Sequence, residues 1–401
     1  MKILVLNCGS SSIKYKLYEM TDETELASGL VERIGSDEAG FRYKNLSGSD
    51  KKETLPIKNH AEGIKIILRF LTDPSDGVIH HVNEINACGH RVVHGGEKFA
   101  SSVVITREVI QEVEKCIPLA PLHNPPNLTG ILACQEIMPQ TPQIAVFDTA
   151  YHQKMPDYAY MYALPNDLYT EDRVRRYGFH GTSHRFVALE CAKMMNKPID
   201  SLKIITCHLG NGSSIAAIHH GRSIDTTMGF TPLEGIMMGT RSGTIDPAII
   251  FFLMREKKMN LDQIDNLLNK QSGFLGVSKV SNDLRDITKA SKEGNELATL
   301  SLQMCSYQLK KFIGSYIAAM NGTDAIVFTG GVGENTEEIR EVSMTGMEYL
   351  GIQLDHQKNL SDRKKTRFIS TDASKVKVMV IFTNEEIMIA RDTFSLLPSH
   401  S

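Results

Sequence analysis

Polar side chains that could act on an anion stand beside glycines at three places in this chain. Arg91 follows a short strand-like run and precedes a Gly-Gly pair, and Arg241 lies within Gly-Thr-Arg-Ser-Gly. His180 precedes a predicted helix in the segment Gly-Phe-His-Gly-Thr-Ser. Arginine on a loop can neutralise charge during phosphoryl transfer, and the N-terminus of a helix attracts anions. The alternative to a role in anion binding is that each arginine is an ordinary solvated residue at the surface.

Acidic side chains follow two apolar runs that read as buried strands. Asp148 comes directly after residues 144–147, and the pair Glu385-Glu386 follows the run at 377–382. Mg²⁺ typically binds one or two carboxylates together with water and substrate phosphates, so these positions suit a magnesium site. Each acid could instead cap the helix that follows it.

A short pattern of apolar run, glycine turn and second apolar run occurs twice. It spans residues 2–13 as KILVLNCGSSSI and residues 203–215 as KIITCHLGNGSSI. Each copy predicts a β-hairpin whose turn exposes backbone N–H groups and hydroxyls. Because glycine lets backbone approach a ligand closely, and successive N–H groups form a concavity for anions, the two turns predict a phosphate site.

A third glycine-rich turn, at 330–335, follows another apolar run. The familiar phosphate motifs are absent, since no G-x-x-x-x-G-K-[ST] occurs and Gly331-Val-Gly333 is followed by Glu-Asn-Thr. The signature set of protein kinases is missing as well. These absences argue against a P-loop NTPase, a dinucleotide-binding Rossmann domain and a protein kinase.

Bulk composition is that of an ordinary globular protein. The chain has 401 residues, which favours two domains, and a net charge of −3 without basic arms, which argues against nucleic acid and membrane partners. Seven scattered cysteines without a C-x-x-C pair argue against disulfides and zinc. The start of the chain reads as a strand rather than a signal peptide, so we expect a cytoplasmic protein.

Strands and helices are expected to alternate, which predicts α/β layers with ligands at the carboxyl ends of strands. Hydrophobic periodicity predicts strands at 144–147, 203–206, 325–328 and 377–382, exposed hairpins over 35–60, and helices at 61–71, 103–117, 127–137, 248–257 and 297–320. In the last helix, a stripe is expected to face the core: Leu300, Met304, Tyr307, Phe312, Tyr316 and Met320. The helix after His180 is expected to be capped by Thr182 or Ser183.

Five ordered motifs together resemble the acetokinase family. They are LNCGSSSIK at 6–14, FHGTSH at 179–184, HLGNG at 208–212, GGVGEN at 330–335 and TNEE at 383–386. The resemblance covers the whole chain and departs from the family pattern at no position that can be compared.

The resemblance implies the superfamily of acetate and sugar kinases, heat-shock chaperone ATPases and actin. Its members have two duplicated ribonuclease H-like domains flanking a nucleotide cleft that closes on its ligand. We therefore expect an N-terminal domain of residues 1–149 plus 386–401 and a C-terminal, nucleotide-binding domain of residues 150–385. The helix after Asn384 would pack back on the first domain, and the protein would be a homodimer.

The resemblance also implies Mg²⁺-dependent, reversible transfer of the γ-phosphoryl group of ATP to acetate, giving acetyl phosphate and ADP by direct in-line attack; Mn²⁺ could replace Mg²⁺. The implied metal-side residues are Asn7 and Glu385, and the implied catalytic residues are Arg91, Asp148, His180 and Arg241. Arg91 would bind the carboxylate, in an apolar pocket formed by Val93, Leu122, Phe179 and Pro232. The residues implied to hold nucleotide are Lys14, His208, Leu209, Gly210, Asn211, Gly212, Asp283, Leu284, Arg285, Gly331, Val332, Gly333, Glu334 and Asn335.

The role of Asp148 stays open between proton transfer and positioning. A carboxylate acceptor is already ionised at neutral pH, because carboxyl pKa values lie near 4. No general base is needed, so we favour positioning of the metal or of water.

Two other functions remain: a propionate or butyrate kinase of the same fold, and a nucleotide-gated scaffold of the chaperone or actin type. A pure nucleotide switch needs no second anion site, and the pair Arg91 and Arg241 therefore argues against the scaffold.

Overall fold

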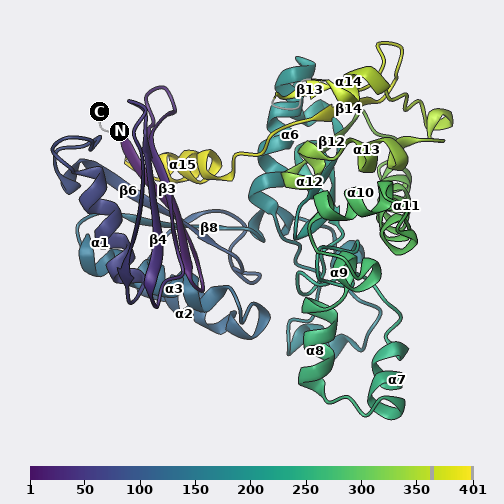
Figure 1. Ribbon diagram of the computed structural model, residues 1–401, viewed down its shortest axis with the longest axis horizontal. Coiled ribbons are helices and arrows are strands. Elements are labelled where there is room, and N and C mark those ends of the chain that lie inside the picture. Colours follow the sequence, from purple (N-terminus) through teal and green to yellow (C-terminus); the bar gives the residue numbers. More distant parts are fainter. Residues whose placement is uncertain (362–364, 399–401) are drawn as a thin grey trace. The chain divides into compact units, whose positions relative to one another are not determined.

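The computed structural model describes residues 1–361 and 365–398 (Figure 1). It divides into two compact units. The first unit contains Met1–Gln153 and Asn384–Ser401, and the second contains Lys154–Thr383. Glu385 therefore belongs to the first unit, together with the helix that it opens.

The first unit is built on one mixed sheet with helices packed against it. Its strands are β1 (Lys2–Gly9), β2 (Ser12–Glu19), β3 (Thr24–Glu32), β4 (Ser36–Asn45), β5 (Asp50–Ile57), β6 (Ile85–Val92), β7 (Val103–Val104) and β8 (Gln143–Phe147). Its helices are α1 (His60–Leu71), α2 (Arg107–Lys115), α3 (Asn124–Ile137) and α15 (Glu385–Ser395), with short 3₁₀ turns η1 (Val82–Glu84), η2 (Ile117–Leu119) and η3 (Ala150–His152).

The second unit carries a smaller mixed sheet and more helices. Its strands are β9 (Lys203–Leu209), β10 (Ser213–His219), β11 (Arg222–Thr226), β12 (Ala325–Thr329), β13 (Arg367–Phe368) and β14 (Lys377–Val380). Its helices are α4 (Asp157–Tyr160), α5 (Asn166–Thr170), α6 (Gly181–Met195), α7 (Ala248–Glu256), α8 (Leu261–Lys270), α9 (Gly273–Ser278), α10 (Leu284–Lys292), α11 (Glu296–Ala319), α12 (Gly330–Asn335), α13 (Glu337–Met344) and α14 (His356–Leu360), with 3₁₀ turns η4 (Ile199–Ser201) and η5 (Glu348–Leu350).

The two sheets repeat one topology. The first has the order β5, β4, β3, β2, β1, β6, β8, β7, and the second has the order β11, β10, β9, β12, β14, β13. In both, three antiparallel strands (β1 to β3, β9 to β11) are followed by two parallel ones (β6 and β8, β12 and β14). This arrangement confirms the expected α/β class with two duplicated ribonuclease H-like sheets.

The two predicted hairpins are confirmed and occupy equivalent places. In β1 and β2 Asn7 pairs with Lys14, and in β9 and β10 His208 pairs with Ser214. The apolar runs of β1 and β9 are buried on both faces, which is why they read as continuous rather than alternating. Asn7 and His208 thus stand at corresponding strand ends, one in each unit.

Helices pack closely on the central strands of the first sheet. A methyl group added to Gly130 of α3 would lie 2.3 Å from the sulfur of Cys8, and one on Gly89 of β6 would lie 2.4 Å from Thr393 Oγ1 in α15. Both distances are too short for any side chain. These two glycines therefore set how near α3 and α15 approach the sheet.

Two of the predicted elements are wrong in detail. The segment predicted as one helix over 103–117 contains the strand β7, then α2 from Arg107 to Lys115. In α11 the expected core-facing stripe is confirmed only in part: Tyr316 and Met320 are buried and Met304 and Phe312 pack against the core, whereas Leu300 and Tyr307 are exposed. The buried side also includes Ala298, Ser301, Cys305, Leu309 and Ile313. Small residues let α11 approach its neighbours, a packing signal that hydrophobicity alone does not reveal.

Candidate active site

Arg91 lies at the centre of a polar cluster in the first unit. Its Nη2 is 2.5 Å from Asp148 Oδ2, and its Nε is 3.1 Å from the same oxygen. Its Nη1 lies 3.4 Å from Asn7 Oδ1, and its Nε lies 3.9 Å from Glu385 Oε2. The ends of the neighbouring strands β1, β6 and β8 and the first residue of α15 supply these groups. The structure thus brings together four residues that the sequence had placed far apart.

The charges in this cluster do not balance. Burial raises the pKa of Glu385 to about 7, and repulsion from Asp148 and Glu386 adds to this while Arg91 opposes it. For Arg91, burial acts to lower the pKa, but Asp148 and Glu385 hold it above its usual value. Glu385 thus tends to keep its proton because the cluster holds too little positive charge. A divalent cation bound to these carboxylate oxygens would supply the missing positive charge.

Lys14 is tied to the same region through Glu386. The Lys14 ammonium forms an ion pair with Glu386 Oε1, and Lys16 lies 3.9 Å from the other oxygen. Burial opposes ionisation of Glu386, yet the ion pair with Lys14 lowers its pKa below the usual range. Asn384, rather than either glutamate, caps α15, because its Oδ1 accepts from the Ile387 N–H at 3.2 Å.

The four residues of the predicted apolar pocket are divided between the units. Val93 is buried and its N–H donates to Asn127 Oδ1 at 3.0 Å, whereas Leu122 is 64% exposed. Both belong to the first unit, while Phe179 and Pro232 belong to the second. The pocket itself remains a prediction.

His180 belongs to a network of histidines and hydroxyls in the second unit. Its Nδ1 lies 2.9 Å from Ser214 Oγ, and its ring stacks on that of His208 with centroids 4.3 Å apart. His184 Nε2 also reaches Ser214 Oγ at 2.7 Å, and Ser183 Oγ lies 2.8 Å from His208 Nδ1. Each imidazole is thus held in a defined orientation.

The expected cap of α6 is wrong. The helix begins at Gly181, and the residue before it is His180 itself, in the left-handed conformation at φ 56°. Thr182 and Ser183 lie inside the first turn, and Ser183 bonds His208 and Thr383 instead of a backbone N–H. A non-glycine residue with positive φ is strained, and such strain concentrates at functional positions. Nothing in the local sequence pattern reveals this backbone conformation.

Arg241 approaches the same turn as His180. A methyl group added to Gly212 would lie 3.4 Å from His180 Nε2 and 3.6 Å from Arg241 Nη1, so both groups face Gly212. The Arg241 Nη1 donates to the carbonyl of Pro232 at 2.9 Å. Among the described residues no carboxylate pairs with it, and burial lowers its pKa. A desolvated guanidinium without an acidic partner is suited to an anionic ligand.

A groove of about 700 Å³ in the second unit joins three of the predicted nucleotide segments. Its lining residues are Gly210, Asn211, Asn282, Asp283, Leu284, Arg285, Gly331, Val332, Asn335 and Thr336. Sequence reasoning missed Asn282 and Thr336, although each directly adjoins a predicted segment. Close packing shapes the groove, since a methyl group on Gly239 would lie 2.1 Å from Asn211 Oδ1.

Other predicted nucleotide residues do not line the groove. Leu209 and Gly333 are buried, and Glu334 accepts hydrogen bonds from the backbone N–H groups of Gly330 (3.0 Å) and Thr383 (3.1 Å). The carboxylate of Glu334 thus ties the segment 330–335 to the backbone that follows the last strand, β14. This segment is the short helix α12 rather than the turn expected from its glycines.

Asp283 and Arg285 form the outer edge of the groove. Asp283 Oδ1 caps α10 by accepting from the Arg285 N–H at 2.8 Å, and the carboxylate also binds the Arg285 guanidinium. The Arg285 side chain is 90% exposed. It can therefore turn towards a bound ligand without leaving a buried partner unpaired.

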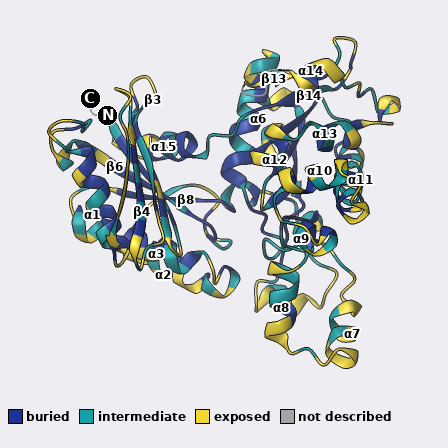
Figure 2. Cartoon of the chain, viewed as in Figure 1, coloured by how far each residue is buried: buried dark blue, intermediate teal, exposed yellow. Residues whose placement is uncertain are grey.

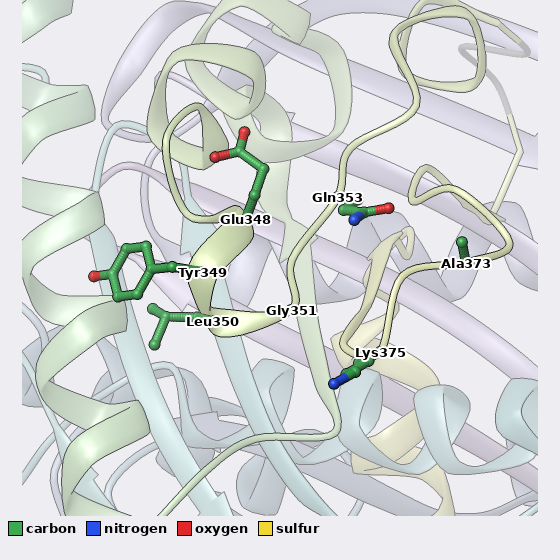
Figure 3. Close-up of a pocket in the computed structure, with 7 residues that line it drawn as sticks. All are labelled: Glu348, Tyr349, Leu350, Gly351, Gln353, Ala373 and Lys375. Carbon is green, nitrogen blue, oxygen red and sulfur yellow. The ribbon is translucent and has the colours of Figure 1, made fainter.

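A separate surface hollow lies elsewhere in the second unit, around η5 and the segment 373–375 (Figure 3). Its lining residues are Glu348, Tyr349, Leu350, Gly351, Gln353, Ala373 and Lys375. None of the residues predicted for the site is among them, so this hollow is distinct from the groove.

The donor groups and the helices of the described chain bear on metal binding and membrane insertion. Within residues 1–361 and 365–398, no group of three or more His, Cys, Asp and Glu side chains is arranged to hold a metal ion alone. Asn7, Asp148 and Glu385 nevertheless fit Mg²⁺, which takes few protein ligands when phosphates and waters complete its shell. No helix in this part of the chain is long and apolar enough to cross a membrane.

Comparison with known proteins gives consistent matches over the full chain. The sequence model of the acetokinase family matches residues 2–391. An acetate kinase of Clostridium botulinum is 56% identical over 393 residues, covering 98% of both chains. The crystal structure of Porphyromonas gingivalis acetate kinase is 50% identical with a TM-score of 0.95, covering 99% of this chain and 100% of that one. A propionate kinase from Francisella tularensis is 42% identical with a TM-score of 0.92 and the same coverage.

Proposed function

The chain belongs to the acetokinase family, and from this premise we propose that it is an acetate kinase. It transfers the γ-phosphoryl group of ATP to acetate, reversibly, giving acetyl phosphate and ADP. The observation that carries the proposal is 56% identity with acetate kinases across 98% of the chain. The groove formed by the three predicted nucleotide segments supports it.

The first unit supplies the residues for the acceptor and the metal. Arg91 turns Nε and Nη2 towards Asp148, and its longest hydrogen bond is the 3.4 Å approach of Nη1 to Asn7. We assign Nη1 to the acetate carboxylate, with Val93, Leu122, Phe179 and Pro232 around the methyl group. Asn7 and Glu385 would hold Mg²⁺, or Mn²⁺, which supplies charge neutralisation on the phosphates.

The role of Asp148 that fits best is positioning. Its carboxylate is buried and bound to Arg91 through two nitrogens of the guanidinium, so it fixes the direction of that side chain. An acetate nucleophile needs no base at neutral pH. We therefore assign Asp148 to the orientation of Arg91 and of the metal's water, not to proton transfer.

The second unit supplies nucleotide binding and stabilisation of the transferring group. The groove holds the nucleotide, and Arg241 and His180 beside Gly212 act on the phosphoryl oxygens. Arginine at the equatorial oxygens of such a transition state can contribute roughly 10³–10⁵ in rate. The bond formed joins an acetate oxygen to the γ-phosphorus, and the bond broken releases ADP.

We also propose a cytoplasmic homodimer. All seven cysteines are free and buried, which suits a reducing compartment. Helix α7 has no buried residue, and its apolar side chains Ile249, Phe251 and Phe252 are each more than 40% exposed (Figure 2). A second copy of the chain would cover this surface.

The hydroxamate assay for acyl phosphate tests the proposal directly. The purified protein with ATP, Mg²⁺ and acetate should accumulate a product that reacts with hydroxylamine, and omission of acetate should abolish it. ATP hydrolysis that proceeds equally without acetate would instead support a nucleotide-gated scaffold.

Propionate is the second candidate acceptor, because a family relative at 42% identity is described as a propionate kinase. One methylene in an apolar pocket changes discrimination by only about 1–3 kcal/mol. Comparison of kcat/KM for acetate, propionate and butyrate decides between them, and we expect acetate to be preferred with propionate as a slower substrate.

A further inference from the structure

The segment 226–235 of the second unit is held by an arginine outside the residues assigned above. It leads from the end of β11 towards the loop that carries Arg241. Arg176 Nη1 faces three successive carbonyls of this segment, those of Thr226 (2.9 Å), Thr227 (3.2 Å) and Met228 (3.4 Å). One guanidinium therefore fixes the backbone where it leaves the sheet.

Glu234 closes a ring of contacts at the far end of the same segment. Its Oε1 accepts from Arg176 Nη2 at 2.8 Å, and its Oε2 accepts from the Tyr162 hydroxyl. The Tyr162 oxygen in turn accepts from the Phe230 N–H at 2.9 Å. The segment is thus fastened at its start, middle and end by the three side chains Arg176, Glu234 and Tyr162, which we call the bracket.

The chain is shaped to admit this bracket. A methyl group added to Gly229 would lie 1.7 Å from Glu234 Oε2 and 2.1 Å from the Tyr162 hydroxyl, so only glycine fits beneath the pair. Gly235, at φ 112°, then turns the backbone, and its N–H donates to Thr244 Oγ1 at 3.1 Å. The segment has little freedom to shift.

The held segment presents one acceptor to Arg241. The carbonyl of Pro232 lies within the segment 226–235 and accepts a hydrogen bond from Arg241 Nη1 at 2.9 Å. No carboxylate among the described residues pairs with Arg241. Its guanidinium bonds instead to this carbonyl and to the Met238 sulfur, which lies 3.6 Å from Nη1. The orientation of the guanidinium therefore depends on where Pro232 is held.

We propose that Arg176, Glu234 and Tyr162 are positioning residues that aim Arg241 and place Pro232. The inference rests on the proposed function, because it assigns the bracket to phosphoryl transfer and to selection of the acyl chain. None of the three touches the reacting atoms. Their removal lets the segment 226–235 relax, so that Arg241 loses its fixed direction and the wall formed by Pro232 retreats.

The test compares Glu234→Ala, Glu234→Gln, Tyr162→Phe and the double variant Glu234→Gln/Tyr162→Phe with wild type. We expect kcat for acetate to fall roughly 10- to 100-fold in Glu234→Ala, since misplacement of a catalytic group by about 1 Å costs that much. KM for ATP should change by less than about threefold, because the groove is untouched. Glu234→Gln should retain part of the rate.

Two further results separate positioning from a structural role. The ratio of kcat/KM for acetate over propionate should fall in the bracket variants, because Pro232 borders the acyl group. The double variant should lose less rate than the product of the two single losses, since Glu234 and Tyr162 share one contact. Glu190→Gln, which removes an exposed ion pair to Lys193 on α6, is the matched control and should change neither value.

The proposal is overturned if the bracket variants unfold at lower temperature while kcat and the acetate preference stay at the wild-type values. A wild-type protein that forms no acyl phosphate would refute the proposed function instead. In that case crystal structures of wild type and Glu234→Ala still decide the positioning claim: the Arg241 to Pro232 contact must be lost in the variant, and its retention refutes the claim.

Discussion

At the level of single residues, the two arginines differ in how their charge is balanced. Arg91 is surrounded by Asp148 and Glu385, whereas Arg241 has carbonyl and sulfur contacts only. An arginine among carboxylates is oriented before any ligand arrives. An arginine without carboxylate partners keeps a positive charge that is not neutralised by the protein. This charge can stabilise a negatively charged transition state.

Arg241→Ala is expected to lower kcat by roughly 10³-fold or more while KM for ATP changes little, because we assign its guanidinium to the transferring phosphoryl group. Steady-state kinetics at saturating acetate measures both values. Arg222→Ala, at an exposed position of β11, serves as the control. An effect confined to KM for ATP would show that Arg241 binds nucleotide without stabilising the transition state.

Arg91→Ala is expected mainly to raise KM for acetate, since the carboxylate loses its cation. The substitution also leaves Asp148 and Glu385 without their arginine, so we expect a loss of about 3 kcal/mol or more in unfolding free energy. Calorimetric titration of acetate and denaturant unfolding measure the two effects separately. Unchanged acetate affinity would remove Arg91 from the acceptor site.

His94 should make the protein sensitive to acid. Burial lowers the pKa of this histidine to about 3, and its Nδ1 accepts the Gly96 N–H at 3.0 Å, which fixes the neutral form. Between the unfolded value near 6.5 and pH 3 only the unfolded chain takes up the proton, so stability falls as pH falls, by up to about 1.4 kcal/mol per pH unit.

The variant His94→Asn keeps an acceptor for Gly96 and should show a shallower loss of unfolding free energy between pH 6.5 and 4 than wild type. His80→Asn, at an exposed position, is the control and should follow the wild-type curve. Parallel curves for His94→Asn and wild type would contradict the assignment.

At the level of elements, the helices α12 and α13 are joined by a buried arginine. Arg340 of α13 is only 1% exposed, and its Nη1 donates to the carbonyl of Gly333 at 2.8 Å. Its Nε donates to Asn359 Oδ1 at 2.7 Å in α14. One side chain therefore links three helices and supports, from behind, the α12 side of the groove.

Arg340→Met is expected to raise KM for ATP several-fold, with kcat at saturation largely kept, because the wall of the groove loosens while the catalytic groups remain. Leaving Gly333 and Asn359 without their donor should cost about 2–3 kcal/mol of stability. Ile264→Ala, a buried change in α8, is a control for destabilisation alone. If both variants raise KM equally, the effect reports stability and not the groove.

At the level of the whole molecule, α7 contains no buried residue, and within it only Ile250 and Leu253 are half-buried. Large exposed apolar side chains gathered on one helix mark an interaction surface in soluble proteins. If the proposed dimer forms through this surface, Phe252→Asp is expected to shift it to a monomer in light scattering coupled to gel filtration. Lys197→Asp, at an exposed polar position, should leave the mass unchanged. A dimer that persists in Phe252→Asp would place the interface elsewhere.

Much of the fold was readable from the chain. Apolar runs on both sides of a glycine turn predicted both hairpins, and buried strands at 144–147 and 325–328 were recognised from unbroken apolar runs. These signals are local: a glycine turn and a period of two residues act within a few positions. The buried face of α11 was predicted only in part, at residues such as Tyr316 and Met320, because the rest of it depends on which neighbour the helix packs against.

The sequence alone determined the identity and order of the motif residues. Through them it determined the family and the two hairpins, whose first strands carry Asn7 and His208 near their ends. Only the tertiary structure decided that Arg91 is bound by Asp148, that Pro232 receives Arg241, and that Asn282 and Thr336 join the groove. The physical reason is the distance along the chain over which each interaction acts. Turns and strands follow from neighbours in the chain, whereas the partner of a charged side chain depends on residues brought near it by packing.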